Sequence, residues 1–143
     1  MAYCVLADIT NTVPADDILQ LTDDTGVGVI DQAMVDEAIA YAGELIDGYL
    51  RGRYTLPLNP VPGMMTRLAA DIAIYRLYAR RPPTGGLMDA ITDRYKAAVK
   101  ILEQIQKGVI SLGAESEGKE PGIVVTNKKA EDRAFSKDVL GGF

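Results

Sequence analysis

The amino-acid sequence predicts an all-α protein: a small bundle of three long helices with two short N-terminal helices and an extended C-terminal tail. Two observations favour it. Apolar residues recur with helical spacing over residues 31–50 and 87–107. Between these segments, a helix formed by residues 63–81 would be apolar around nearly its whole circumference. With 143 residues, 48% of them hydrophobic, the chain is long enough for one domain with a core.

Two short helical turns are expected at the N-terminus, one around Leu6 and Ile9 and one over Ile18–Leu21. Between them, Thr12 is a candidate cap and Pro14 suits the first position of the second helix. Both turns are too short to be stable alone, so we expect them to lie across the longer helices.

Residues 23–31 resemble the first nine positions of a calcium-binding EF-hand loop, with Gly28 at position six, where that loop requires glycine. Positions three, five and twelve lack the carboxylates expected there, because they are Thr25, Val27 and Met34. We therefore predict no calcium binding, and a turn that caps the next helix, with Asp31 as its N-cap residue.

From Asp31 an amphipathic helix is expected to run to about Leu50. Its small residues would allow a close helix crossing; they are Ala38, Ala42 and Gly43. The following segment, Tyr54–Pro62, alternates prolines with apolar residues, which indicates an extended strap packed on the domain.

The central helix is expected to begin between Pro60 and Gly63 and to end before Pro82. Because few polar residues interrupt it, neighbours must cover it on several sides. We predict that four of its residues lie in the core: Leu68, Ile72, Tyr75 and Leu77. A third long helix should run from about Leu87 to Lys107 and stop at Gly108.

Charge is distributed unevenly along the chain, whose net charge is −5. Residues 1–50 hold ten acids and no lysine or arginine, whereas residues 51–113 hold ten bases against four acids. The two regions can neutralise each other within one molecule, which the sequence slightly favours, or between neighbouring copies in a head-to-tail contact.

Seven arginines could form a phosphate-contacting face: Arg51, Arg53, Arg67, Arg76, Arg80, Arg81 and Arg94. No recognised nucleic-acid motif accompanies them, so pairing with carboxylates is the better prediction. Five tyrosines are expected to be half-buried packing residues with hydroxyls at the rim: Tyr49, Tyr54, Tyr75, Tyr78 and Tyr95.

The sequence lacks histidine and has one cysteine, Cys4, which excludes an intramolecular disulfide, a cysteine-based zinc site and a histidine-dependent catalytic triad. Cys4 is expected to be a small buried residue. We predict a protein that is not an enzyme, holds no metal or cofactor, and has no membrane span or signal peptide.

Two parts are expected: a helical adaptor domain at residues 1–113, and a C-terminal tail for partner docking at residues 114–143. The tail carries four apolar residues with spacing that would place them on one face of a short helix: Phe135, Val139, Leu140 and Phe143. We predict that these residues bind a neighbouring copy or another protein; the alternative is that they fold back on their own bundle.

A resemblance to a known family is carried by the run IDGYLRGRYTLPLNPVP followed by RLAADIAIYRLY. It extends upstream through LTDDTGVGVID and downstream to the terminal FSKDVLGGF. The chain resembles small proteins encoded by Mu-like bacteriophages and prophages among their head and tail morphogenesis genes. That family is similar to the small helical head-to-tail connector (adaptor) proteins at the portal of tailed phages.

The resemblance implies a structural virion protein of the neck, assembled in the host cytoplasm. Its partners would be the portal protein, neighbouring copies in a homo-oligomeric ring (a dodecamer by analogy), and a stopper or tail-terminator protein. Genome DNA would pass through the lumen without sequence-specific binding. The alternatives are a DNA-binding or regulatory phage protein, a stopper or tail-completion protein, or a non-virion assembly factor.

Overall fold

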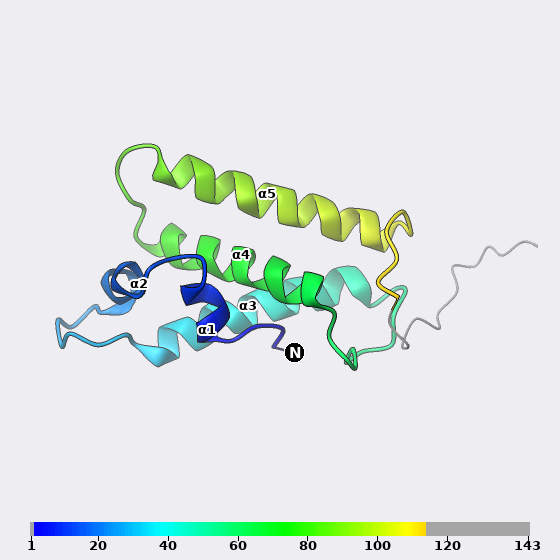
Figure 1. Ribbon diagram of the computed structural model, residues 1–143, viewed down its shortest axis with the longest axis horizontal. Helices are drawn as coiled ribbons and strands as arrows, with labels where there is room; N and C mark the ends of the chain where they lie inside the picture. The colour runs from blue at the N-terminus through cyan, green and yellow to red at the C-terminus, as the bar shows by residue number, and fades with distance from the viewer. Residues whose placement is uncertain (1, 114–143) are drawn as a thin grey trace, which may run out of the picture.

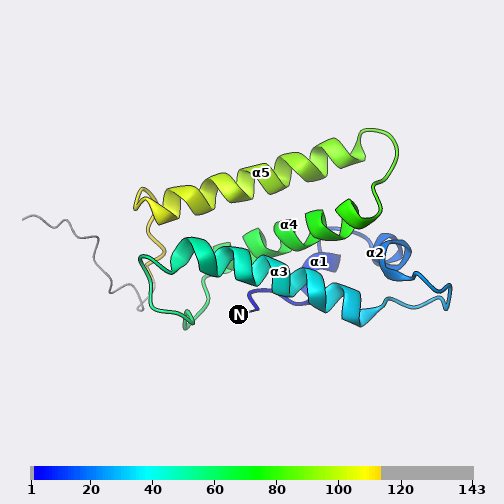
Figure 2. The same ribbon diagram turned by 180° about the vertical axis from the view of Figure 1, so that it is seen from behind.

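The computed structural model describes residues 2–113, and over this range it confirms the predicted all-α fold. Three long helices, α3 (Gln32–Leu50), α4 (Gly63–Arg80) and α5 (Leu87–Gln106), run side by side in alternating directions (Figure 1). Two short helices, α1 (Leu6–Thr10) and α2 (Ala15–Thr22), pack on α4, as expected (Figure 2). The predicted tail at residues 114–143 lies outside the described residues and stays a prediction.

Helix α4 is the centre of the bundle because it packs against each of the other four helices. Leu68, Ile72 and Leu77 are at most 5% exposed, which confirms the core prediction for these three residues. Placing Tyr75 in the core was wrong, since this residue is only partly buried, as the description of it as a half-buried packing tyrosine predicted. Its ring stacks on Tyr95 of α5 with the centroids 4.1 Å apart, so it packs at the α4–α5 edge.

Helix α3 begins where the sequence predicted, because the Asp31 side chain accepts a hydrogen bond from the Ala33 backbone N–H at 3.0 Å. The small residues expected to permit close packing are all buried: Ala38, Ala42 and Gly43. Helix α5 ends one residue earlier than predicted. Gly108 follows with a φ of 87°, a left-handed conformation that favours glycine at a helix end.

The cap predicted at Thr12 was wrong. Helix α2 starts one residue after Pro14, which occupies the N-cap position itself and provides no side-chain hydrogen bond. Asp16 and Asp17 lie in its first turn, where negative charge is favourable.

The strap between α3 and α4 is packed on the domain as predicted: Tyr54 is 1% exposed and Leu58 is 2% exposed. Two hydrogen bonds tie its start to the segment around the end of α5. Arg53 donates to the Ile105 carbonyl at 2.8 Å, and the Tyr54 hydroxyl accepts from the Leu112 N–H at 3.0 Å. Tyr54 is therefore a core residue, and so is Tyr78 at 4% exposed, rather than the half-buried residues expected.

A buried polar pair joins the N-terminal segment to α3. The hydroxyl of Tyr3, which is 4% exposed, donates a hydrogen bond to the carboxylate of Asp47, which is 9% exposed. Burial is the main cause of the raised pKa of Tyr3, and the Asp47 carboxylate raises it further, so the phenol keeps its proton at neutral pH. The sequence analysis missed this pair, although Asp47 lies between Gly43 and Leu50 on the buried side of α3.

Candidate partner-binding surfaces

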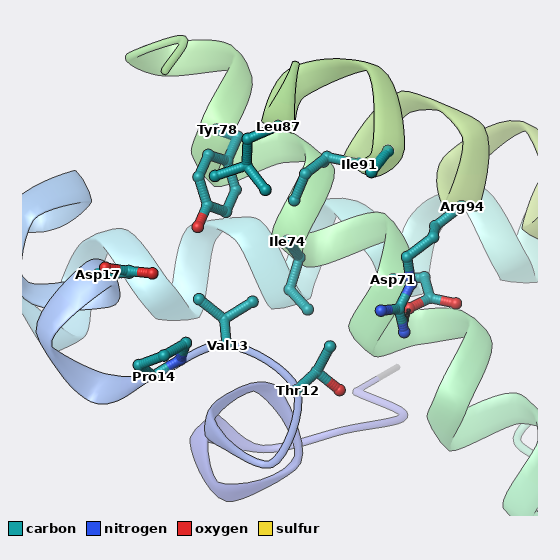
Figure 3. A pocket seen from close by; sticks show the side chains of 11 residues that line it. Thr12, Val13, Pro14, Asp17, Asp71, Ile74, Tyr78, Leu87, Ile91 and Arg94 are labelled. Carbon is teal, nitrogen blue, oxygen red and sulfur yellow. Dashed lines mark hydrogen bonds and ion pairs between the residues drawn. The ribbon is translucent and has the colours of Figure 1, made fainter. Parts of the chain in front are cut away.

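Two adjoining cavities form a groove that has α4 as its floor, α5 on one side and the α1–α2 segment on the other. We call it the α4 groove. The cavity near the C-terminal end of α4 has a volume of about 180 Å³ (Figure 3). The larger cavity, near the N-terminal end, has a volume of about 640 Å³. Both share three residues: Thr12, Asp71 and Arg94.

An ion pair crosses the middle of the groove (Figure 3), where Arg94 of α5 donates to Asp71 of α4 at 2.8 Å. Burial raises the pKa of Asp71, and the Arg94 guanidinium partly offsets this rise. At the smaller end, the pKa of Tyr78 is raised by burial and by the negative charge of Asp17. A groove with apolar walls and a paired polar centre suits the binding of protein side chains.

Three further arginines, two on α4 and one just after its end, tie neighbouring segments to it. Arg76 donates to Glu37 of α3 at 2.8 Å and stacks over the Tyr41 ring, 4.5 Å from its centroid. Arg80 donates to Asp24, and so does Arg81. These pairs join the acid-only region to the base-rich region within one molecule, the arrangement that the sequence slightly favoured.

Arg67 is the exception among the charged residues of α4. No carboxylate within residues 2–113 pairs with it, and its side chain lines the larger cavity of the α4 groove. The prediction that the arginines pair with carboxylates is confirmed for four of the seven: Arg76, Arg80, Arg81 and Arg94.

The connection between α2 and α3, residues 23–30, is organised by one carboxylate; we call it the Asp23 loop. Asp23 Oδ1 accepts from the backbone N–H groups of Gly26 and Val27 at 2.9 and 3.0 Å, and Oδ2 accepts from that of Gly28 at 2.8 Å. These bonds, led by the one from Gly28, hold the pKa of Asp23 below its usual value. Gly26 and Gly28 supply the positive φ angles of 78° and 84° that this arrangement needs.

The prediction that this loop does not bind calcium stays a prediction. Among residues 2–113, no group of three or more metal-ligating side chains could hold a metal ion. The sequence analysis correctly described this segment as a turn leading to the Asp31 cap. It did not anticipate that Asp23 would order the loop.

The base of the Asp23 loop is fixed to the bundle. The hydroxyl of Thr22, which is fully buried, donates to the Ile18 carbonyl at 2.9 Å and accepts from the Asp31 N–H at 3.1 Å. At the end of α4, Arg80 donates to the Leu21 carbonyl at 2.7 Å, and Arg81, which follows the helix, donates to the Gln20 carbonyl at 2.6 Å.

Two valines lie at the tip of this loop in full contact with solvent. Val27 is 67% exposed and Val29 is 61% exposed, among the most exposed large apolar residues of the described chain. The sequence signal for them was present in the run Gly-Val-Gly-Val, where β-branched residues alternate with glycines outside any amphipathic pattern. An ordered loop that displays apolar side chains is a candidate protein contact.

The four predicted partner-binding residues, Phe135, Val139, Leu140 and Phe143, lie outside the described residues. Cys4 is buried as predicted, at 5% exposed, and burial raises the pKa of its thiol to about 11. No helix in the described part of the chain is long and apolar enough to cross a membrane.

Known proteins resemble this chain over much of its length. The profile of the family described as "Bacteriophage Mu, Gp36" matches residues 3–126. The Mu-like prophage FluMu protein gp36 of Haemophilus influenzae is 39% identical over 84 residues, 59% of this chain and 56% of that protein. Gene product J of Escherichia phage Mu is 36% identical over 92 residues, 64% of this chain and 62% of that protein. The chain thus aligns with less than two thirds of the length of either relative.

Proposed function

The chain belongs to the bacteriophage Mu Gp36 family, and from this membership we propose that it is a structural virion protein of the phage neck. In this role it is a head-to-tail connector, or adaptor, that forms a ring on the portal and leaves an axial channel for DNA. It acts by binding proteins, without catalysis. Family membership carries the proposal, together with the resemblance of the family to small helical adaptor proteins.

The surface of the bundle supports a protein-binding role. The α4 groove and the tip of the Asp23 loop offer one concave and one convex apolar contact on a small helical domain. The proposed partners are the portal protein, neighbouring copies, and a stopper or tail-terminator protein on the tail side.

Helix α3 offers a surface compatible with passing DNA. It contains no lysine or arginine, and its exposed residues include Asp36, Glu37 and Glu44. If this face lines the channel, like charges discourage the genome from sticking to the wall. Sequence-specific DNA binding is disfavoured, because most of the arginines that could contact phosphates are held in ion pairs.

The test is to disrupt the gene in an inducible prophage and to examine the lysate by electron microscopy. A connector predicts filled or empty heads and separate tails, with joined particles restored by expressing the chain from a plasmid. Normal numbers of joined particles would refute the connector role. Mass spectrometry of purified wild-type virions separates a virion component from an assembly factor that is absent from the particle.

The alternative of a DNA-binding or regulatory protein is tested by a mobility-shift titration across salt concentrations. The connector proposal predicts no specific shift at physiological ionic strength. A shift that survives that salt concentration and depends on DNA sequence would favour the alternative.

A further inference from the structure

We propose that the tip of the Asp23 loop of one copy binds in the larger cavity of the α4 groove of a second copy. This contact specifies how copies meet in the proposed ring, and its place in the virion rests on the proposed function. It names the two surfaces that meet when copies associate head to tail.

The loop is already in a binding-ready conformation. Three backbone N–H groups bond to Asp23, and the base of the loop is held by Thr22 and by two arginines at the end of α4, Arg80 and Arg81. Docking such a loop loses little conformational freedom, so the burial of Val27 and Val29 is not offset by a large ordering cost. Leaving both valines in solvent is unfavourable, which gives the tip a reason to bind an apolar surface.

The larger cavity of the groove has the complementary chemistry. Its apolar lining comes from Met64, Leu68 and Ile101, and its volume of about 640 Å³ has room for two valine side chains. Its wall also carries two acids: Asp71 pairs with Arg94, and Asp8 accepts from the Val5 N–H at 2.8 Å and keeps its negative charge. Arg67 remains as the positive group available to an incoming carboxylate.

The loop supplies the matching negative charge. Asp23 and Asp31 flank the two valines, and neither pairs with a lysine or arginine among residues 2–113. Asp23 is ionised near neutral pH, as an aspartate ordinarily is, and the loop bonds lower its pKa further. An acidic loop with an apolar tip therefore meets an apolar cavity with an arginine at its wall.

The loop cannot reach the groove of its own molecule. Its base is fixed to Arg80, and with a rise of about 1.5 Å per residue Arg67 lies roughly 20 Å away along α4. The receiving groove must therefore belong to another copy. A contact between two different surfaces is heterologous, and repetition of it closes a ring when the rotation between copies permits.

The experiment places a photoreactive probe beside the valines and leaves both valines intact. Thr25→Cys is made in a full-length Cys4→Ala background and labelled with benzophenone maleimide. It is then mixed with full-length chain that carries ¹⁵N but no benzophenone. After irradiation, mass spectrometry identifies the residues into which the probe has inserted, and the ¹⁵N mass shows which chain they belong to. Insertion into residues 64–68 of the ¹⁵N chain is expected. The matched control carries the same label at Val109→Cys, which is 72% exposed and lies at the other end of the bundle.

Three variants sharpen the result. Val27→Ser combined with Val29→Ser in the labelled chain should lower insertion at least about tenfold, since the apolar contact is lost. Arg67→Glu in the ¹⁵N chain should lower it about fivefold at low salt, whereas Arg67→Lys should retain most of it. All three positions are exposed, so circular dichroism melts should confirm that each variant folds.

Several outcomes would overturn the proposal. They are insertion no greater than with the Val109 control, insertion within the same chain, and insertion elsewhere on the second copy. Detection of the chain in the neck without this cross-link would leave the proposed function standing and refute the loop–groove contact. If the chain forms this cross-link in solution but is absent from virions, the loop–groove contact stands and the proposed function is refuted.

Discussion

Helix α4 buries nine of its eighteen residues against the rest of the bundle, whereas the Asp23 loop is held by hydrogen bonds and keeps its two valines in solvent. The contrast separates two roles of apolar side chains in one small protein. On α4 they stabilise the fold, because folding removes them from water. On the loop, apolar side chains contribute little to the stability of the fold, so we expect them to stabilise a contact with another molecule.

The largest effect is expected on α4. Leu68→Ala or Ile72→Ala should each lower the free energy of unfolding by about 2–5 kcal/mol, because each leaves a cavity under four packed helices. Thermal or chemical denaturation measures the change. Unchanged melts for both variants would show that α4 is not the centre of the core.

The second-largest effect on the free energy of unfolding is expected at a buried polar contact. Tyr3→Phe removes the hydroxyl that donates to Asp47 and should cost about 1–3 kcal/mol, since a buried carboxylate loses a donor. Tyr75→Phe is the matched control, because it keeps the stacked ring and should cost much less. Equal losses for the two variants would argue against a structural role for the Tyr3–Asp47 bond.

The Asp23 loop should respond to acid. Since the folded pKa of Asp23 lies below its unfolded value of 3.8, the loop bonds contribute stability above that pH and lose it as pH falls through the folded pKa. In an NMR titration, the amide signals of Gly26, Val27 and Gly28 should move together in a transition whose midpoint lies below pH 3.8. Asp23→Asn should abolish this common transition, and a transition near pH 5 in the unchanged protein would contradict the account.

The sequence predicts that the last residues contribute to joining rather than to folding. Truncation after Gly122 should leave the melting temperature nearly unchanged but stop heads from joining tails. Complementation of a prophage lacking the gene measures the second effect. A large loss of stability in the isolated chain would instead show that Phe135, Val139, Leu140 and Phe143 belong to the core of their own molecule.

The smallest effect on stability is expected at the loop tip. Val27→Ser combined with Val29→Ser should change the free energy of unfolding by less than about 0.5 kcal/mol per site, because both side chains are already in solvent. The comparison with α4 would fail if this double variant melted as early as Leu68→Ala.

The fold could be predicted from the sequence because periodicity reports burial directly. The near absence of polar residues around α4 predicted its central position, and the Asp31 cap and Gly108 marked helix ends correctly. The orientation of a ring at a helix edge is a tertiary property, so Tyr75 was placed too deep and Tyr54 and Tyr78 not deep enough. The spacing of residues along the sequence does not report how deeply such a ring is buried.

The candidate binding surfaces were harder to predict. The α4 groove combines residues from four helices, and Arg67 stands out as having no carboxylate partner within residues 2–113 only once the partners of the other arginines are known. Similarity to an EF-hand drew attention to residues 23–31 but not to the three N–H groups that bond to Asp23. Side-chain to backbone bonds of this kind depend on local φ angles that the residue types permit but do not dictate.

The most direct test of the central claim is a reconstruction of the virion neck by electron cryomicroscopy, after mass spectrometry has shown the chain in purified particles. The account predicts a ring of helical subunits between the portal and the tail. Each subunit should match the arrangement of α3, α4 and α5 and should surround an open channel. A neck whose density is filled by other proteins, or the chain found elsewhere in the particle or absent from it, would contradict the account.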